Sequence, residues 1–327
     1  MRAFISALAI AAFAVSATLP AVAQTVWEMP TEYPATAIPG EGVETFSKLV
    51  NEASGGRLMI KPSYDASRGI KSAAMIAAVQ KGDVAAGDAF VGALSPVDPL
   101  FALSSLPFLT ASIDDARRLT DLARPAYDRK LAQFGQKILY TTPWPASGIW
   151  SKDALVGPEA LTGLSIRTYD ATSTAVMNAA GAKASNLSFA DAMPKVKDGS
   201  VTAVLSSGDG GAGRNLWDFL PNFAEINYVF PISIATVNLA AYEALPADLR
   251  KIIDDAAVAT EQRQWTAIRT RLDENYARMR VNKVAIQTKI SPAMAHILSQ
   301  AAAPVVDEWR KKAGPEGAAV LDRYNKR

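Results

Sequence analysis

The sequence of 327 residues has no cysteine and only one histidine, His296. The absence of cysteine excludes disulfides, thiol nucleophiles, zinc–thiolate sites and a lipid-modified N-terminal cysteine. A single histidine also removes histidine-based triads and multi-histidine metal sites. We expect His296 to be an ordinary residue of a C-terminal helix, partly buried or on the surface. A chain so short of catalytic side chains favours binding over catalysis, and we expect no cofactor and no metal.

The sequence also lacks a marked excess of positive or negative charge. The chain has 34 Lys and Arg against 32 Asp and Glu, a net charge of +2. This balance gives no electrostatic reason to expect nucleic acid as a partner. With 49% hydrophobic and 20% charged residues, the composition is typical of a soluble globular protein, and the length is enough for two domains of ordinary size.

The only long apolar run lies at the N-terminus. After Arg2, apolar residues run from Ala3 to Leu19, and Ala21-Val22-Ala23 then precede Gln24. A cationic start, an apolar middle and a small-x-small end are typical of a secretory signal peptide. We therefore predict a signal peptide over residues 1–23, cleavage after Ala23 and export to the periplasm. No later run approaches ~18 uncharged apolar residues, so we do not expect the mature chain to span a membrane.

Short strands alternate with helices along the rest of the chain. Strand patterns occur near residues 26–29, 58–60, 84–86, 138–140, 149–150, 164–166, 182–184, 201–205 and 284–286. Helical patterns lie between most of them, for example after Ser112 and after Ser188, each of which has an aspartate three residues later as in a capping box. This alternation predicts an α/β fold with a largely parallel sheet wrapped by helices.

One helical pattern is unusually long. It begins at Pro246 and continues to about Arg280, which at ~1.5 Å per residue makes a helix of about 50 Å. A coiled coil is the alternative, but the irregular apolar spacing and the flanking strands argue against it. We expect a helix that braces two domains, preceded by the apolar run Tyr228–Leu239, which is long enough to cross between them.

The segment of residues 161–170 contains the main candidate for ligand binding, Arg167. Apolar and polar residues alternate up to Arg167 as in a short strand, and Asp170 or Thr172 can cap a following helix. Arg167 therefore stands at the C-terminal end of a strand, where open α/β sheets bind small ligands. Its guanidinium can hold a carboxylate by two hydrogen bonds. The alternative is an arginine paired with a surface aspartate, and this segment alone does not decide between the two.

The stretch Gly208–Gly213 is rich in glycine and follows the predicted strand at residues 201–205. Such a loop before a helix, here expected to start near Arg214, can cradle an anion. It lacks the Gly-Lys-Ser/Thr ending of a nucleotide-binding loop. We therefore interpret it as a tight turn that lets the backbone approach a ligand or the other domain.

Five short motifs resemble the DctP-type solute-binding proteins of tripartite ATP-independent periplasmic (TRAP) transporters. They are Ser54-Gly-Gly-Arg-Leu58, Gln80-Lys-Gly-Asp83, Leu106-Pro-Phe-Leu109, Leu161-Thr-Gly-Leu-Ser-Ile-Arg167 and Ala244-Leu-Pro246. Each motif alone is weakly specific. The set occurs in family order and covers nearly all of the chain after the signal peptide.

The resemblance implies a two-domain α/β fold of the periplasmic binding protein kind, with the ligand cleft between the domains and the long helix bridging them. We expect residues 24–145 with 236–275 to form one domain, and residues 146–235 with 276–327 to form the other. The resemblance also implies that Arg167 pairs with the carboxylate of a small organic anion. A monomeric receptor would then deliver this ligand to a small and a large membrane subunit.

Two positions depart from the family pattern near the expected pocket. Ala146 stands where many members carry a second arginine, and Ser206 stands in place of a ligand-binding asparagine. The aromatic residues Trp144, Trp150 and Tyr169 lie near the expected pocket walls. A pocket that has lost a cation and an amide favours a ligand with one carboxylate and a compact apolar or ring-shaped body. The alternative is that these aromatic residues pack in the hinge.

The remaining candidate ligand contacts are Tyr33, Asp88, Phe90 and Asp209, which follow predicted strands. A competing hypothesis is a periplasmic enzyme, a lyase or hydrolase with Asp88 or Asp209 as its base. No paired carboxylates and no activated nucleophile support it. Another is a receptor for an ATP-driven importer, against which the long helix after Pro246 argues.

Overall fold

The structure is a computed structural model in which residues 24–326 are described. The signal peptide predicted for residues 1–23 and its cleavage after Ala23 lie outside the described residues. The strands are β1 (Thr25–Pro30), β2 (Leu58–Ser63), β3 (Ala86–Phe90), β4 (Gln136–Pro143), β5 (Ser147–Ser151), β6 (Ser165–Thr168), β7 (Lys183–Asn186), β8 (Ala203–Ser207), β9 (Asn222–Ala224), β10 (Ile232–Asn238) and β11 (Ala285–Gln287).

The helices complete the predicted alternation. The α-helices are α1 (Ile38–Ala53), α2 (Ser72–Lys81), α3 (Ile113–Ala132), α4 (Ala171–Ala179), α5 (Phe189–Lys197), α6 (Gly208–Ala212), α7 (Leu239–Glu243), α8 (Ala247–Val281), α9 (Pro292–Lys312) and α10 (Gly314–Asn325). Short 3-10 turns are η1 (Val91–Leu94), η2 (Pro99–Ser105), η3 (Pro158–Leu161) and η4 (Leu216–Asp218). The predicted N-caps Ser112 and Ser188 accept hydrogen bonds from the backbone three residues later.

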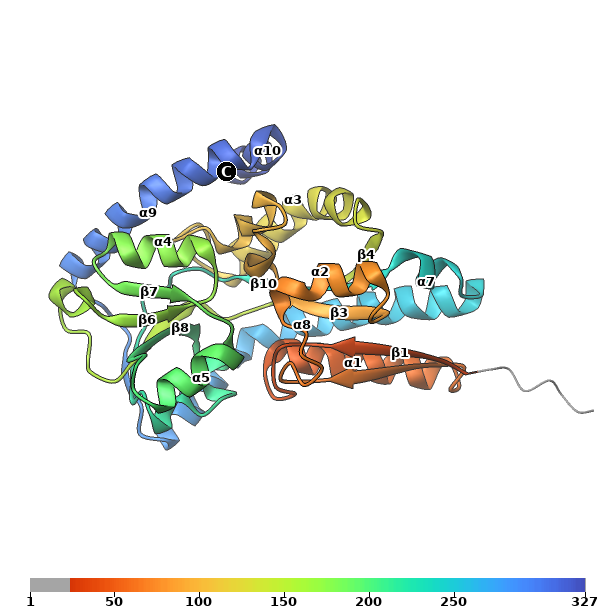
Figure 1. The fold of residues 1–327 in the computed structure, drawn as a ribbon, viewed down its shortest axis with the longest axis horizontal. Helices are drawn as coiled ribbons and strands as arrows, with labels where there is room; N and C mark the ends of the chain where they lie inside the picture. The colour runs from red at the N-terminus through yellow and green to blue at the C-terminus, as the bar shows by residue number, and fades with distance from the viewer. Residues whose placement is uncertain (1–23, 327) are drawn as a thin grey trace, which may run out of the picture.

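Two lobes are built around separate sheets (Figure 1). The first lobe contains the pair β1-β2 and the three-stranded sheet β3-β10-β4. The second lobe contains the six-stranded sheet β11-β9-β5-β8-β6-β7. Each lobe has its own buried apolar clusters, and a further cluster joins residues of both lobes, among them Tyr33 and Trp144 with Trp150 and Phe189.

The prediction of a largely parallel sheet is wrong. β10 runs antiparallel to both β3 and β4, and β5 runs antiparallel to both β8 and β9. These two strands are the ones that the chain enters directly after passing from one lobe to the other. They are not reached through a helical crossover inside the lobe, which is the connection that makes neighbouring strands parallel. The pairs β1-β2, β6-β7, β6-β8 and β9-β11 are parallel.

The two strand-to-strand connections between the lobes run side by side. One lies between β4 and β5, and the other between β9 and β10. They are joined by backbone hydrogen bonds from Trp144 N to Pro231 O (2.9 Å), from Ser147 N to Val229 O (3.0 Å) and from Tyr228 N to Ser147 O (2.9 Å). The predicted domain boundaries stay predictions, and the one between residues 235 and 236 falls inside β10.

The long helix predicted from Pro246 to about Arg280 is confirmed as α8, a single helix of 35 residues. Near its start Leu249 and Ile253 belong to the core of the first lobe, whereas Tyr276 and Met279 near its end belong to the cluster that joins the lobes. In Figure 1, α8 starts near α7 and passes behind β3 toward the second lobe. The helix therefore packs against the first lobe near its start and against the cluster that joins the lobes near its end.

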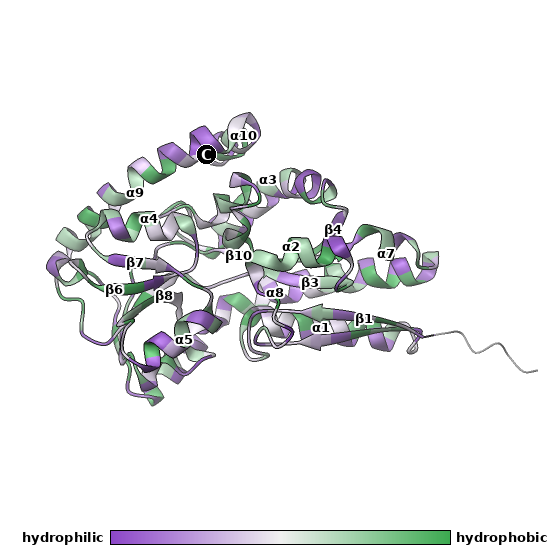
Figure 2. Cartoon of the chain, viewed as in Figure 1, coloured by the Kyte–Doolittle hydropathy of each residue, from purple (hydrophilic) through white to green (hydrophobic). Residues whose placement is uncertain are grey.

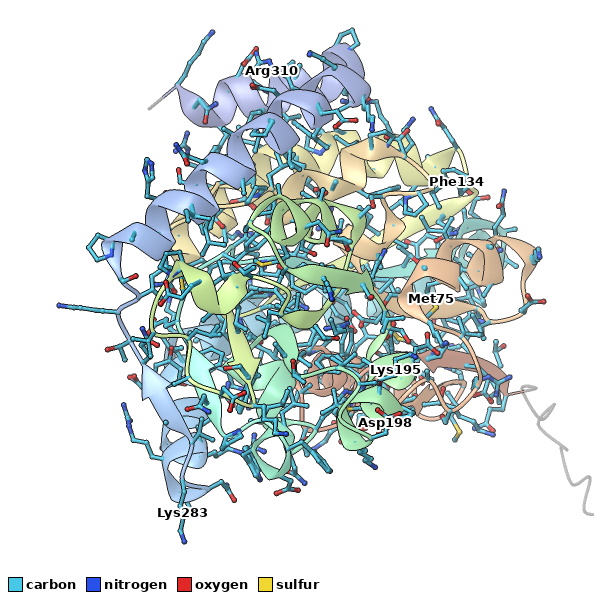
Figure 3. The ribbon with its side chains drawn as sticks, turned by 60° about the vertical axis from the view of Figure 1, so that its left-hand side comes forward. Met75, Phe134, Lys195, Asp198, Lys283 and Arg310 are labelled. Atoms are coloured by element: carbon cyan, nitrogen blue, oxygen red, sulfur yellow. The ribbon has the colours of Figure 1, made fainter. Side chains whose placement is uncertain are left out.

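The C-terminal helices also reach both lobes, because α9 packs on α4 and α10 packs on α3. Hydrophilic and hydrophobic residues are mixed along α3 and α9 (Figure 2), and charged side chains such as Lys283 and Arg310 project from the outside of the molecule (Figure 3). His296 is exposed on α9. Within residues 24–326, no helix is both long enough and apolar enough to cross a bilayer.

The interpretation of Gly208–Gly213 as a turn before a helix is wrong. Gly208–Ala212 is itself the short helix α6, and the Ser207 hydroxyl caps it by accepting a hydrogen bond from Gly210 N at 3.1 Å. Glycine is a poor helix former. Tertiary packing outweighs that preference here, because a Cβ on Gly211 would lie 2.2 Å from the Trp150 ring.

Candidate ligand-binding site

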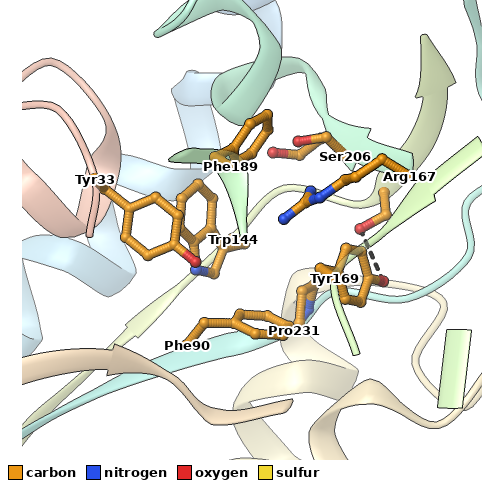
Figure 4. A pocket seen from close by; sticks show the side chains of 10 residues that line it. Tyr33, Phe90, Trp144, Arg167, Tyr169, Phe189, Ser206 and Pro231 are labelled. Atoms are coloured by element: carbon orange, nitrogen blue, oxygen red, sulfur yellow. Dashed lines mark hydrogen bonds between the residues drawn. The ribbon is translucent and has the colours of Figure 1, made fainter. Parts of the chain in front are cut away.

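A small pocket lies where the two lobes meet the connections between them (Figure 4). The first lobe contributes Tyr33 and Phe90, and the connections contribute Trp144 and Pro231. The rest of the lining comes from the second lobe: Ser147, Arg167, Tyr169, Phe189, Ser206 and Ser207. Arg167 is the only charged residue among them.

Arg167 is held in the pocket by the backbone rather than by an acid. It lies near the end of β6 and is only 4% exposed. Its Nε donates to Leu187 O at 2.8 Å and its Nη1 to Leu205 O at 3.3 Å. In the described part of the chain, Arg167 has no carboxylate oxygen within 4.0 Å of its guanidinium nitrogens. The guanidinium thus faces the pocket without a carboxylate partner.

Burial alters the electrostatics of this cation. The pKa of Arg167 is lowered mainly by desolvation, which disfavours the charged form, while the nearby Tyr33 and Glu32 act in the opposite direction. An arginine still keeps its proton at neutral pH. A buried cation without a counter-ion is costly, and an anionic ligand removes that cost.

Aromatic side chains make up most of the remaining wall. Tyr33 meets Trp144 edge to face at 4.7 Å between ring centroids, and Phe90 meets Tyr169 in the same way at 5.1 Å. The Trp144 indole donates to the Ser233 hydroxyl at 3.0 Å, so its polar end is already satisfied. These contacts leave rigid apolar faces toward the pocket, which suit a small ring.

Hydroxyl groups provide the polar contacts on the second lobe. Tyr169 donates to Ser147 Oγ at 3.3 Å, the bond drawn in Figure 4. Ser207 Oγ is occupied by Gly210 N, whereas Ser206 Oγ has no hydrogen bond to another described residue. Ser206 and Ser147 are therefore the hydroxyls best placed to bond a polar group of a ligand.

Nothing in this pocket resembles a metal centre. Among residues 24–326, no three His, Cys, Asp or Glu side chains gather closely enough to hold a metal ion. The combination of one buried cation, aromatic walls and hydroxyls at an interlobe cleft is that of a site for a small organic anion.

The model of the DctP family, bacterial extracellular solute-binding protein family 7, matches residues 30–312. The chain belongs to this family. Its fold is that of the two-domain solute receptors of TRAP transporters, whose members are periplasmic. A solute-binding protein of Verminephrobacter eiseniae is 24% identical over 304 residues, which cover 90% of this chain and 88% of that protein.

Two solved receptors are similar in structure. DctP7 of Bordetella pertussis, an extracytoplasmic solute receptor binding pyroglutamic acid, is 29% identical with a TM-score of 0.88, and the match covers 92% of this chain and 100% of that one. A TRAP solute-binding protein from a marine metagenome, specific for pyroglutamate, is 26% identical with a TM-score of 0.88, and the match covers 93% and 99%. Both matches extend over nearly the whole length of this chain.

Six of the nine residues that the sequence suggested for the receptor's ligand site line the pocket: Tyr33, Phe90, Trp144, Arg167, Tyr169 and Ser206. Trp150, Asp88 and Asp209 do not. Trp150 is fully buried, packs against Phe223 at 5.2 Å between centroids and donates to Ser207 O at 3.1 Å. It belongs to the buried cluster that joins the two lobes.

The two aspartates have partners within the protein. Asp209 on α6 accepts from Ile38 N at 2.9 Å, from Arg271 Nε at 2.5 Å and from Asn275 Nδ2 at 3.2 Å, so it ties the second lobe to α1 and α8. Asp88 on β3 accepts from the Thr31 hydroxyl at 2.8 Å, and burial raises its pKa to about 7. Neither aspartate is among the residues that line the pocket.

Four pocket residues of the receptor were not suggested by the sequence: Ser147, Phe189, Ser207 and Pro231. Ser147 and Ser207 are neighbours of positions that were singled out, Ala146 and Ser206. Phe189 is the first residue of α5, directly after the predicted cap Ser188. Its ring lies 4.2 Å from the Arg167 guanidinium carbon, a cation–π contact that no local pattern predicts.

Proposed function

We propose that this protein is the periplasmic receptor of a TRAP transporter for a compact monocarboxylate with a ring-shaped body, of the pyroglutamate class. The observation that carries the proposal is Arg167, a buried guanidinium facing the pocket with no acidic partner among the described residues. Such a group stabilises one carboxylate by a bidentate, charge-assisted pair.

The rest of the pocket lining supports a single charge and a ring. A second ligand carboxylate would meet apolar walls, and an unpaired buried charge costs several kcal/mol. A ring gains by leaving water, at ~25 cal/mol per Å² of apolar surface removed. The pocket is small and lined closely by aromatic side chains, which suits a compact molecule. Ser147 and Ser206 offer hydrogen bonds to a ring amide.

The similar receptors support the same class, since three solved structures at 26–29% identity bind pyroglutamic acid or pyroglutamate. We propose that the lobes close on the ligand about the paired connections, as binding proteins of this architecture do. The closed, monomeric receptor would then meet the transporter's membrane subunits. The predicted signal peptide provides the route of export.

An enzymatic function has less support. The two aspartates considered as bases, Asp88 and Asp209, do not line the pocket. Asp209 has its acceptor sites used by Ile38, Arg271 and Asn275. A base must reach the proton that it removes, and neither aspartate faces the place where a ligand would lie.

Calorimetric titration with pyroglutamate, and with variants at Arg167, tests the proposal. Breaking a buried charge pair costs ~3–5 kcal/mol, so Arg167→Ala should weaken binding by roughly two to four orders of magnitude. Arg167→Lys should recover only part of the affinity, because the planar fork is lost. Arg310→Ala, at an exposed arginine of α9, is the matched control and should bind as the wild type does.

The ligand class is tested by titrating pyroglutamate, succinate and glucuronate side by side. We expect pyroglutamate to bind most tightly. Near-normal affinity in Arg167→Ala would refute the role of the guanidinium. Tightest binding of succinate would refute the preference for one carboxylate.

A further inference from the structure

A second guanidinium, that of Arg214, lies directly behind the wall of the pocket. Arg214 follows α6 and is not among the residues that line the cavity. Its Nη2 donates to Glu32 O at 2.9 Å and its Nη1 pairs with Asp65 at 3.2 Å. Its Nε is buried and has no hydrogen-bond partner among the described residues. A cationic donor is thus left unused close to an anion-binding site.

The Phe189 ring contacts both guanidinium groups. The guanidinium carbon of Arg167 lies 4.2 Å from the ring centroid and that of Arg214 lies 4.8 Å from it. Phe189 and Arg167 line the pocket, whereas Arg214, in contact with the same ring, does not. The two cations still repel each other. The pKa of Arg167 is lowered mainly by burial, and the positive charge of Arg214 adds a smaller contribution in the same direction.

The position of this ring is fixed from several sides. Phe189 is 4% exposed, and its backbone N–H donates to Glu32 Oε1 at 3.2 Å. The side chain also packs against α6, since a Cβ on Gly210 would lie 3.6 Å from the ring. The ring therefore forms a fixed apolar wall between the pocket and Arg214.

We propose that Phe189 determines specificity by separating the pocket, with its single cation Arg167, from the second cation Arg214. The proposal rests on the proposed function, because it explains how a receptor for one carboxylate excludes ligands with two. A dicarboxylate held by Arg167 would place its second carboxylate against the Phe189 ring, where it finds no counter-charge. Without the ring, that carboxylate would reach the unused Nε of Arg214.

The test is the affinity of glutarate relative to pyroglutamate, measured by calorimetry in four proteins. They are the wild type, Phe189→Ala, Arg214→Gln and the double variant. Phe189→Ala should raise the ratio by ~10-fold or more, as expected for a new charge pair in a partly enclosed site. The double variant should return the ratio to near its wild-type value. Phe189→Leu, which keeps an apolar wall, should leave the ratio near that of the wild type.

Arg214→Gln alone keeps the test decisive even if Phe189→Ala fails to fold, as judged by circular dichroism. With the ring in place, removal of the Arg214 charge should not change the ratio. A selective loss of glutarate affinity in Arg214→Gln would overturn the proposal, because Arg214 would already reach the ligand. An unchanged ratio in folded Phe189→Ala would overturn it too, as would a gain that persists in the double variant. The proposed function is judged separately, by pyroglutamate binding to the wild type and to Arg167→Ala.

Discussion

The buried charges near the cleft differ in how many donors or acceptors the protein gives them. Asp209 receives hydrogen bonds from Ile38, Arg271 and Asn275, and this set completes its coordination. Arg167 donates hydrogen bonds to only two backbone carbonyls. Because a buried charge needs full compensation, Asp209 is suited to holding the lobes together, whereas Arg167 is suited to taking up a ligand.

Asp88 shows a third case, with one hydrogen bond from Thr31 and its other oxygen buried without a partner among the described residues. Burial raises its pKa from 3.8 to about 7, and the charge of Glu32 adds to the rise. As the pH increases from about 4 to about 7, the unfolded chain loses a proton that the folded protein retains. The free energy of unfolding therefore falls over this window, by up to ~1.4 kcal/mol per pH unit from this group.

The Asp88→Asn variant should remove that contribution. We expect its free energy of unfolding, measured by urea titration at several pH values between about 4 and 8, to fall less steeply than that of the wild type. Thr31→Val removes the donor that lowers the pKa of Asp88, so it should extend the window to higher pH. Identical slopes in the wild type and Asp88→Asn would show that Asp88 ionises normally in the folded protein.

At the scale of single elements, α6 depends on the absence of a side chain at one position. A Cβ on Gly211 would lie 2.2 Å from Trp150, whereas a Cβ on Gly208 would lie 3.3 Å from the flexible side chain of Met279. Neither glycine has a positive φ. An alanine at Gly211 therefore tests overpacking against Trp150, whereas an alanine at Gly208 tests mainly the higher intrinsic helix preference of alanine.

Gly211→Ala should destabilise the protein by ~1–3 kcal/mol, because the Trp150 ring is fully buried and cannot move freely. Gly208→Ala, the matched control, should be close to neutral. Thermal unfolding midpoints of the two variants give the comparison. Equal midpoints would mean that the Trp150 ring can shift to make room.

Elements with local signals were predictable from the sequence. Ser112, Ser188 and Asp170 cap helices as their spacing predicts, and α8 follows the long apolar pattern. These features depend on residues a few positions apart. The glycine-rich helix α6 was not predictable, because it depends on packing against distant residues such as Trp150.

The pocket shows the same division. Arg167 was identified because the end of a strand is a local feature and because the motif around it is shared with a family. The role of Trp150 was not separable from that of Trp144, since a sequence does not show which face of a strand turns toward the other lobe. Phe189 gave no signal, because its contact with Arg167 joins helix α5 to strand β6, and these elements meet only in the folded lobe.

At the scale of the whole molecule, one carboxylate joins the helices of the two lobes. Glu32, in the first lobe, accepts from Ser72 N at the start of α2 at 2.9 Å and from Phe189 N at the start of α5 at 3.2 Å. α2 has no side-chain cap of its own at Lys71. Glu32 is 4% exposed, and its negative charge suits the positive end of both helix dipoles.

A second contact crosses the cleft nearby. Lys71 Nζ lies 2.8 Å from Asp191 Oδ2, but these side chains are 38% and 49% exposed. An exposed ion pair contributes at most ~1 kcal/mol, whereas a hydrogen bond to a buried charge contributes ~1.5–3 kcal/mol. The Glu32 contact should therefore contribute more than the Lys71–Asp191 pair to holding the lobes closed.

Closure and affinity are linked, because contacts made only in the closed state add to the free energy of binding. Glu32→Asp keeps the charge but is one methylene shorter, so it should no longer reach both α2 and α5. We expect pyroglutamate affinity to fall by ~10-fold in Glu32→Asp and by less than about fivefold in Lys71→Met. Small-angle scattering of the ligand-free variants should show a more open average shape for Glu32→Asp. If Lys71→Met weakens binding more than Glu32→Asp does, the exposed pair holds the lobes closed and the order of the two contacts is reversed.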